Sequence, residues 1–393
     1  MKHESIKSVK GSDKLEKERK VSILQDVLRF KSVNDHEEEV AKYLQTLLAE
    51  FEISSTLVEY APGRSNLIAE LAGTGPGKTL GFTGHLDVVS AGDESEWIHP
   101  PFEAVIDGSK LYGRGSTDMK GGTVGLVLAM IELKEKAIPF NGKIKLLATV
   151  GEEIGTVGSK QLTELGYADD LDGLLVAEPS GANSFVTAHK GSMSYKITSL
   201  GKSSHSSMPQ EGINSIDQLA EFIVQANAKM AEITAAYENP KLGRTTHAVT
   251  IINGGNQINS IPEKAVIEGN IRSIPDYDNT AIMTLMQSIV DEINQSIEGS
   301  LKIEWTQNNY PVEKPEDSDL VKAALKVIGD LPIIGISPTT DAAQFIQAKA
   351  NFDFLLHGPG VPSLPHQVNE YVEIEDYLNF IERFQAIALE YLT

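Results

Sequence analysis

The sequence predicts an α/β fold in which a smaller ferredoxin-like domain is inserted into a mixed-sheet domain. Three observations support this. The chain has 393 residues, more than one hydrophobic core usually organises. Both ends alternate helical patterns with short apolar runs, whereas the middle alternates with a period of two residues. The order of elements in the middle, β-α-β-β-α-β, is that of a ferredoxin-like unit.

The first part of the chain predicts helices separated by buried strands. Helical spacing is expected at 21–30, 38–51 and 122–136, and strands at 66–71, 79–89, 143–150 and 171–178. Strands that are apolar throughout and lie between helices are typical of a sheet covered on both faces.

The character changes near residue 190 and changes back near 310. We expect strands at 193–200, 246–254, 264–274 and 301–307, helices at 214–235 and 279–297, and then elements of the first kind at 320–329, 352–360 and 375–391. The predicted organisation is a polar N-terminal extension (1–19), a first domain (20–189 and 309–393) and an inserted domain (190–308). A cleft between the two domains is the expected place for a site.

Composition excludes several classes of protein. The formal net charge of −21 argues against binding to nucleic acid or to an anionic membrane. The chain contains no cysteine, which excludes disulfides and thiolate metal sites and favours a cytoplasmic location. No apolar stretch approaches the ~20 residues of a membrane helix, and the charged N-terminus does not resemble a signal peptide. An anionic substrate would need local cations to overcome the acidic surface.

One segment, AGTGPGKT at 72–79, resembles a degenerate phosphate-binding loop. Such a loop must be followed by a helix that holds the phosphates, but the next residues favour a strand. We therefore expect a hairpin turn here and keep an NTPase only as a formal alternative.

Histidine and carboxylate side chains stand at five predicted strand ends or loops. His85 and Asp87 in GHLDVV lie on one face of a strand, and a carboxylate two residues away suits the partner of a metal-bound imidazole. Asp118 in the glycine-dense GRGSTDMKGG could bridge two ions about 3.5–4 Å apart. Taken singly, a core histidine and a helix N-cap are the simpler interpretations.

The remaining donors are Glu152 and Glu153 in GEEIG, Glu178 in EPS and His366 in PHQVNE. Two adjacent carboxylates repel each other unless a cation or a proton is present, so one could bind metal while the other acts as a base. Spacing does not say which, and an isolated pair would be read as a solvated turn. Together the donors predict a two-metal hydrolytic centre with Zn²⁺, or Co²⁺ as the alternative.

These motifs resemble the di-zinc deacylase and exopeptidase family that includes succinyl-diaminopimelate desuccinylase, acetylornithine deacetylase, aminoacylase and glutamate carboxypeptidase. The similarity extends from about residue 20 to the C-terminus and is strongest to the desuccinylase type. It implies a di-metal hydrolase domain with an inserted lid and dimerisation domain.

The resemblance also implies individual roles. His85 and Glu178 would complete one metal site, Glu153 and His366 the other, and Asp118 would bridge two Zn²⁺ ions in each subunit. Glu152 would be the general base and Asp87 the partner of His85. His205 in GKSSHSSMP would polarise the scissile carbonyl, often in the other subunit of a homodimer. From the residues alone, His205 reads as an exposed turn histidine.

Three further residues would bind substrate. Arg272 in GNIRSIP matches the carboxylate-binding arginine of the family, and its fork-shaped guanidinium suits that role. An exposed strand-end arginine is the alternative. Lys190 in AHKGS and Asn259 in GGNQINSIP would assist, although several relatives have arginine at the Lys190 position.

The expected activity is hydrolysis of the amide bond of an N-acyl amino acid. The favoured substrate is N-succinyl-LL-2,6-diaminopimelate, an intermediate of lysine biosynthesis, with acetylornithine or a dipeptide as alternatives that require the same catalytic residues. A metal-dependent binding protein without turnover is the alternative of a different class.

Overall fold

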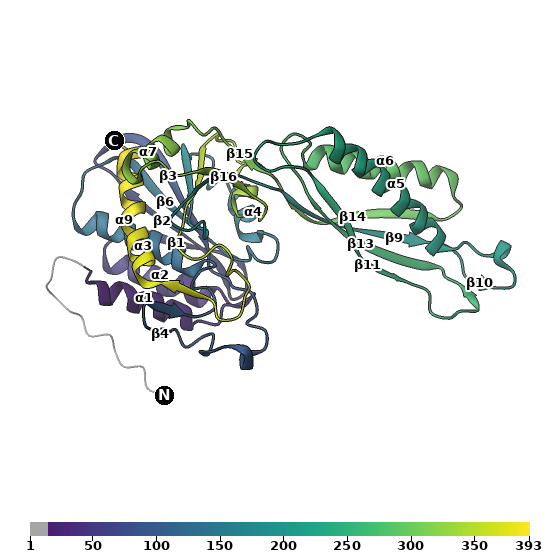
Figure 1. Ribbon diagram of the computed structural model, residues 1–393, viewed down its shortest axis with the longest axis horizontal. Coiled ribbons are helices and arrows are strands. Elements are labelled where there is room, and N and C mark those ends of the chain that lie inside the picture. Colours follow the sequence, from purple (N-terminus) through teal and green to yellow (C-terminus); the bar gives the residue numbers. More distant parts are fainter. Residues whose placement is uncertain (1–14) are drawn as a thin grey trace.

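The first lobe is organised around a nine-stranded sheet with the order β1-β2-β6-β3-β7-β17-β8-β15, and β16 pairs with β8. The structure is a computed structural model that describes residues 15–393 (Figure 1). β3 runs parallel to β6 and β7, whereas β1, β2 and β6 pair antiparallel, so the sheet is mixed and the fold prediction is confirmed. The strands are β1 (Ser54–Ala61), β2 (Arg64–Ala72), β3 (Gly75–His85), β6 (Asn141–Thr149), β7 (Gly173–Val176), β8 (Phe185–His189), β15 (Val312–Glu313), β16 (Ile333–Ile336) and β17 (Asp353–Leu356).

Both faces of this sheet are covered, as the continuous apolar strands predict. Leu146 of β6 packs into a core with the first group of helices, while its neighbour Leu147 belongs to a second core on the other side. The first group is α1 (Lys17–Arg29), α2 (Glu38–Glu50), α3 (Lys120–Glu135), α7 (Asp319–Ile328) and α9 (Ile374–Tyr391). On the other face lie α4 (Val157–Glu164) and α8 (Ala342–Phe345). Residues 1–14 of the predicted N-terminal extension (1–19) lie outside the described residues. The last three positions of that predicted extension, 17–19, are already part of α1, which begins at Lys17.

The segment 72–79 does not form the predicted hairpin. β2 and β3 are not neighbours, because β6 lies between them and pairs with both. The strand β3 begins at Gly75, so the segment leads directly into the sheet and not into the helix that a phosphate-binding loop requires.

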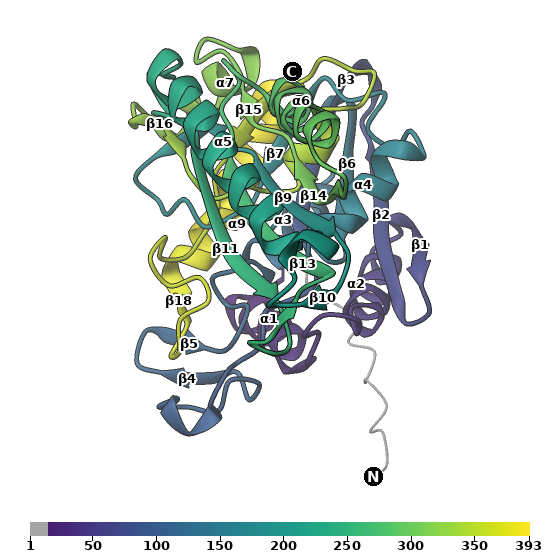
Figure 2. The ribbon, with the colours of Figure 1, turned by 90° about the vertical axis from the view of Figure 1, so that its right-hand side faces the viewer.

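The second lobe has the β-α-β-β-α-β order that the sequence predicts. Its antiparallel sheet has the order β11-β13-β9-β14. The helices α5 and α6 lie side by side over one face, and the whole lobe extends away from the first (Figures 1 and 2). The elements are β9 (Ser192–Leu200), α5 (Ser215–Ala236), β11 (Thr246–Gly254), β13 (Lys264–Arg272), α6 (Asn279–Ser296) and β14 (Ser300–Asn309). Burial alternates along β9 and β13, because only the helix-covered face is packed.

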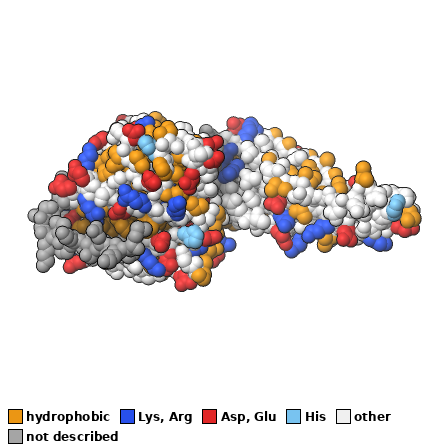
Figure 3. All heavy atoms as spheres, turned by 90° about the horizontal axis from the view of Figure 1, so that it is seen from below, with side chains coloured by type: hydrophobic (Ala, Val, Ile, Leu, Met, Phe, Trp, Pro, Cys, Tyr) orange, Lys and Arg blue, Asp and Glu red, His pale blue; other side chains and the backbone are white. Residues whose placement is uncertain are grey.

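Short elements complete both lobes. A small sheet of β4 (Val105–Asp107), β5 (Lys110–Tyr112) and β18 (Tyr371–Glu373) brings the GRGSTDMKGG loop beside the PHQVNE loop. At the tip of the second lobe, β10 (Ser204–His205) pairs with β12 (Ser260–Ile261). The 3-10 turns η1 (Glu94–Glu96) and η2 (Pro209–Glu211) are the remaining elements. Acidic and basic side chains are mixed over both lobes on the face in Figure 3. None of the helices within 15–393 is long and apolar enough to cross a membrane.

Candidate metal centre

His85 ends β3 and is fully buried at the carboxyl edge of the first sheet. Its Nε2 atom lies 3.1 Å from Asp118 Oδ1 and 3.7 Å from Glu178 Oε1. Its Nδ1 atom lies 2.9 Å from the backbone oxygen of Asp87 and 3.7 Å from the carboxylate of that residue. Because Nδ1–H donates to this oxygen, Nε2 is left as the coordinating atom.

Asp118 faces a second imidazole with its other oxygen. Its Oδ2 atom lies 3.5 Å from His366 Nε2, and His366 Nε2 lies 2.9 Å from Glu153 Oε2. His85, Asp118 and Glu178 form one group of atoms that could hold a metal ion, and Asp118, Glu153 and His366 form another. Within each group the atoms lie within 4.8 Å of one another. Five predicted ligands from distant parts of the chain are thus brought together, with Asp118 shared.

The charges of this cluster fit divalent cations. Burial raises the pKa of Glu178 well above its usual range, and the Asp118 charge adds to the effect. Burial opposes protonation of His85, yet the surrounding carboxylates raise its pKa well above the usual value. One oxygen of Glu153, Oε1, is buried without a hydrogen-bond partner in the described structure. Bound cations would neutralise these closely packed carboxylates, which otherwise compete for protons. They would also give the buried Glu153 oxygen a partner.

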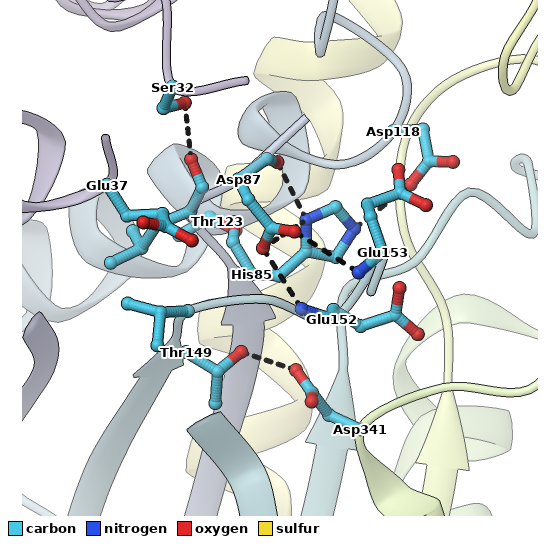
Figure 4. A network of polar contacts seen from close by, with 12 residues as sticks. Ser32, Glu37, His85, Asp87, Asp118, Thr123, Thr149, Glu152, Glu153 and Asp341 are labelled. Atoms are coloured by element: carbon cyan, nitrogen blue, oxygen red, sulfur yellow. Dashed lines mark hydrogen bonds and ion pairs between the residues drawn. The ribbon is translucent and has the colours of Figure 1, made fainter. Parts of the chain in front are cut away.

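Glu152 differs from Glu153 in its surroundings. The backbone N–H groups of Glu152 and Glu153 both donate to the Asp87 carboxylate, each at 3.1 Å (Figure 4). Asp87 therefore orients the turn that contains Glu152 and Glu153 (the acidic turn), and it also lies beside His85. Within residues 15–393, the Glu152 carboxylate receives no hydrogen bond, and burial raises its pKa well above the usual range. An unpaired carboxylate with a raised pKa is suited to accept and return a proton.

Glu370 holds the Asp118 loop, a role that the sequence did not predict. This buried carboxylate accepts hydrogen bonds from the backbone N–H groups of Gly115 at 3.0 Å, Thr117 at 2.8 Å and Asp118 at 2.9 Å. Arg114 Nη1 donates to it at 2.7 Å. Since Glu370 follows His366 by four positions, it connects the loops of two ligands.

Backbone conformation also fixes these loops. His366 has a φ of +63°, in the left-handed region that residues other than glycine rarely adopt, and it lies in a loop rich in proline. Gly122 allows the start of α3 to approach β7, because a Cβ atom there would lie 2.1 Å from the backbone oxygen of Ala177. This close approach brings the Asp118 loop next to Glu178.

A buried polar network links the acidic turn to the second lobe. The Thr156 hydroxyl donates to Asn309 Oδ1 at 2.9 Å, and Gln344 Nε2 donates to the same oxygen at 2.9 Å. Asn279 Nδ2 donates to the backbone oxygen of Asn309 at 3.0 Å. The network therefore joins the start of α4, the end of β14 and the start of α6.

The predicted substrate residues fall into two separate places. His205 and Asn259 are exposed at the β10–β12 tip, which Figure 1 shows far from the metal-ligating strands of the same chain. Arg272 and Lys190 lie at the other end of the lobe, near the junction with the first. Lys190 is not free, because its ammonium donates to the Arg244 backbone oxygen at 2.5 Å.

Among the residues that the structure describes, Arg272 is a partly buried cation without a partner. No hydrogen bond or ion pair joins its guanidinium to another residue of the described range, and burial lowers its pKa. An unpaired, partly buried guanidinium in a protein with a net charge of −21 favours an external anion as its partner.

A cavity of about 500 Å³ opens beside the metal-ligating residues. Its lining includes Glu152, other members of the cluster and the loop around Thr339 and Thr340. Next to these loops Asp341 is buried and accepts a hydrogen bond from Thr149 (Figure 4), and burial raises the pKa of Asp341 to about 6. The arrangement brings candidate metal ligands, a free carboxylate and a substrate-sized space into one place.

The chain is similar to known proteins over most of its length. The model of peptidase family M20/M25/M40 matches residues 81–390. A "Probable succinyl-diaminopimelate desuccinylase" of Staphylococcus aureus (strain MRSA252) is 38% identical over 402 residues, which cover 95% of this chain and 97% of that protein. A protein of the same name from Staphylococcus epidermidis (strain ATCC 12228 / FDA PCI 1200) is 35% identical and covers 96% of this chain and 99% of its own.

Two solved structures share the fold. The aminopeptidase PepT from Bacillus cereus superposes with a TM-score of 0.75 at 22% identity, over 96% of this chain and 99% of the other. An M20 family metallo-carboxypeptidase from Sulfolobus solfataricus also gives a TM-score of 0.75 at 22% identity, over 95% of this chain and 99% of the other.

Proposed function

The chain belongs to peptidase family M20/M25/M40 and is a hydrolase, and from that premise we propose that it removes the acyl group from an N-acyl amino acid. The favoured substrate is N-succinyl-LL-2,6-diaminopimelate, which would yield succinate and LL-2,6-diaminopimelate in lysine biosynthesis. The name shared by relatives that are 35–38% identical supports this choice. The lack of cysteine supports a cytoplasmic location.

One observation supports the hydrolytic centre above all others: the two oxygens of Asp118 face two different imidazoles. We propose that His85 and Glu178 hold one ion, that Glu153 and His366 hold the other, and that Asp118 bridges them. Ligands that are only imidazole and carboxylate suit Zn²⁺, with Co²⁺ as the alternative. When bound, two such ions would polarise the scissile carbonyl and lower the pKa of the attacking water.

The side chains of the protein would then move one proton. Glu152 would accept a proton from the attacking water while the C–N bond of the amide is still intact. As that bond breaks, Glu152 would return the proton to the nitrogen of the leaving amine, so the same carboxylate acts as base and then as acid. Asp87 would keep Glu152 in place through the two backbone N–H groups that it accepts.

Arg272 would hold a carboxylate of the substrate, with Lys190 at the same end of the lobe, and Asn259, which lies at the tip with His205, would assist in the centre of a second subunit. The guanidinium has no partner in the described structure, which leaves its donors available.

Replacing Arg272 with alanine should raise KM for carboxylate-bearing substrates by roughly tenfold or more, because a charge-assisted hydrogen bond contributes about 1.5–3 kcal/mol. An Arg29→Ala variant, which changes an exposed arginine paired with Asp26, is the control. An unchanged KM would remove Arg272 from the substrate site.

His205 lies at the tip of the second lobe, and we propose that it serves the centre of a second subunit. Such a homodimer would form through the lobe that contains β11, whose exposed edge strand is suited to pairing. His205 would then donate a hydrogen bond to the carbonyl oxygen of the substrate as negative charge develops on it.

The activity is tested by incubating the metal-loaded protein with succinyl-diaminopimelate, acetylornithine and a set of dipeptides, and comparing kcat/KM. We expect the highest value for succinyl-diaminopimelate and loss of turnover after chelation. If metal binds but none of the amides is hydrolysed, the protein is a metal-dependent binding protein and the proposed function is wrong.

A further inference from the structure

The first residues of β2 contact the acidic turn and have no part in the proton transfer proposed above. Arg64 and Asn66 stand two positions apart at the start of this strand, so their side chains lie on one face of it. Asn66 Oδ1 accepts the backbone N–H of Val150 at 2.9 Å. The Arg64 guanidinium reaches Gly151, because a Cβ atom there would lie 2.7 Å from Arg64 Nη2. Both side chains therefore touch the residues that lead into Glu152.

A buried ion pair fixes the orientation of Arg64. Its Nη2 atom donates to Glu37 Oε1 at 2.5 Å and its Nε atom donates to Glu37 Oε2 at 3.0 Å, so the planar guanidinium meets the carboxylate through two bonds. Glu37 and Arg64 are both buried. The Arg64 Nη1 atom lies 2.8 Å from the carboxylate of Asp35. A lysine could not replace this fork, because its ammonium is a single point charge.

Arg64 also brings positive charge close to Asp87. The Asp87 carboxylate is fully buried and accepts the two backbone N–H groups of the acidic turn, so a nearby cation stabilises its charge. Burial alone would lower the pKa of Arg64, but the neighbouring carboxylates, Glu37 first and Asp87 among them, raise it above the usual value. The guanidinium is therefore a permanent positive charge that is close to Asp87 and in contact with Gly151.

We propose that Arg64 is a positioning residue for the hydrolysis: it holds the acidic turn, and with it Glu152 and Glu153, in the place where the first moves the proton and the second binds metal. Arg64 acts through Gly151 and Asp87 and does not touch the substrate. This inference rests on the proposed hydrolytic function. Replacing a residue that supports a metal ligand typically costs about 10- to 100-fold in activity or metal affinity.

The substitution Arg64→Lys keeps the positive charge and removes the paired hydrogen bonds. In the metal-loaded full chain, kcat for succinyl-diaminopimelate should fall about 10- to 100-fold, whereas KM should stay within about twofold because Arg64 does not bind substrate. Calorimetric titration of the metal-free protein should also show Zn²⁺ binding that is about tenfold weaker or more, since the same turn contains Glu153. Glu37→Gln, which releases the guanidinium from its partner, should have the same effects.

Glu132→Gln is the matched control. Glu132 is likewise a buried carboxylate and pairs with Lys20 and Lys136, but it lies in the last turn of α3, whose first turn follows the Asp118 loop. This variant should have a lower Tm, with kcat and Zn²⁺ affinity unchanged.

A double-mutant cycle tests whether Arg64 acts through Asp87. In an Asp87→Asn background, Arg64→Lys should lower kcat by a smaller factor than in the wild type, because both residues act on the same turn. Losses that multiply fully in the double variant would show that the two residues act independently and would overturn the inference.

An unchanged kcat in folded Arg64→Lys would also overturn it, as would a rise in KM alone or an equal loss of kcat in Glu132→Gln. Thermal unfolding shows whether each variant is folded, and Glu37→Gln provides the test if Arg64→Lys is not. If the wild type binds two ions but hydrolyses no amide, the proposed function is wrong, and the Zn²⁺ affinities of Arg64→Lys and Glu132→Gln still decide whether Arg64 positions the turn.

Discussion

Glu370 Oε1 accepts the backbone N–H of Asp118 at 2.9 Å, so a buried carboxylate holds the loop of the residue whose two oxygens face both histidines. Within residues 15–393, Glu370 belongs to neither group of atoms that could hold a metal ion. Glu370 instead positions Asp118 through this hydrogen bond. It also constrains the loop of His366, because the two residues are only four positions apart in the chain.

Glu370→Gln should therefore weaken the binding of both metal ions. The amide can keep one accepting oxygen, but its NH₂ group would face the Arg114 and Gly115 donors. Loss of a hydrogen-bonding partner behind a ligand typically costs 10–100-fold in metal affinity. Calorimetric titration of the metal-free protein measures this, with Glu375→Gln, an exposed position, as the control. Equal affinities in the two variants would show that Glu370 does not position the bridging residue.

Glu152→Ala should lower kcat by roughly 10²- to 10⁴-fold, because proton transfer by a placed side chain accounts for about that factor. Both ions should remain bound, since the carboxylate of Glu152 lies outside the two groups of ligand atoms. Glu153→Ala is the matched variant and should lose one ion. Loss of metal from the Glu152 variant would transfer the proton-moving role to another residue.

A mixture of Glu152→Ala and His205→Ala subunits should recover activity that neither variant has alone. If His205 acts across a dimer, the His205→Ala subunit retains Glu152 and receives the histidine of its partner. Random pairing then restores about a quarter of the sites. Co-expression, size measurement in solution and kcat test this. Activity equal to the mean of the two variants would place His205 in its own subunit's site or outside the reaction.

Stability should decrease as the pH falls below 6.5, in part because of His357. Its Nδ1–H donates to the Ser184 oxygen at 3.1 Å, and its Nε2 accepts from Arg383 at 3.0 Å. Burial, together with the Arg383 charge, lowers the pKa of His357 to about 3. The unfolded chain, with a histidine pKa near 6.5, binds the proton first, so protonation favours unfolding from pH 6.5 down to about 3.

The contribution of His357 to the free energy of unfolding should fall by about 2 kcal/mol between pH 6.5 and pH 5. Denaturant unfolding of the metal-free protein at several pH values measures the slope. His357→Gln should be less stable at pH 7 but should lose less stability on acidification. The His357→Gln variant should still lose some stability at low pH, because burial also lowers the pKa of His189, to about 4. Identical slopes in the two proteins would contradict the neutral state of His357.

The sequence predicts most of the fold because the hydrophobic period of a long segment indicates whether it forms a helix or a strand. The helices 214–235 and 279–297 agree with α5 and α6 to within one residue at each end. Several strands were missed, among them β1 with its eight residues and two shorter strands. β8 has five residues and β16 has four, and neither is long enough to display a period. The hairpin predicted at 72–79 was wrong because strand order depends on partners elsewhere in the chain, here β6.

The proximity of the candidate metal ligands could be predicted because each stands at a strand end or in a loop, where the carboxyl edge of the sheet brings them together. Glu370 lies in the PHQVNE motif, but no role was predicted for it, because its donors are the Arg114 side chain and three backbone N–H groups more than 250 positions away. The amides around Asn309 have no sequence pattern at all. Their role is to join the two lobes through hydrogen bonds, and it depends on how the folded lobes meet.

Metal stoichiometry tests most directly whether folding creates a paired site for two divalent cations. Wild-type protein dialysed against Zn²⁺ and analysed by elemental mass spectrometry should contain two ions per chain. His85→Ala and His366→Ala should each retain about one, and Asp118→Ala should lose tight binding of both. A wild-type stoichiometry below one, or three folded variants that bind two ions like the wild type, would contradict the account.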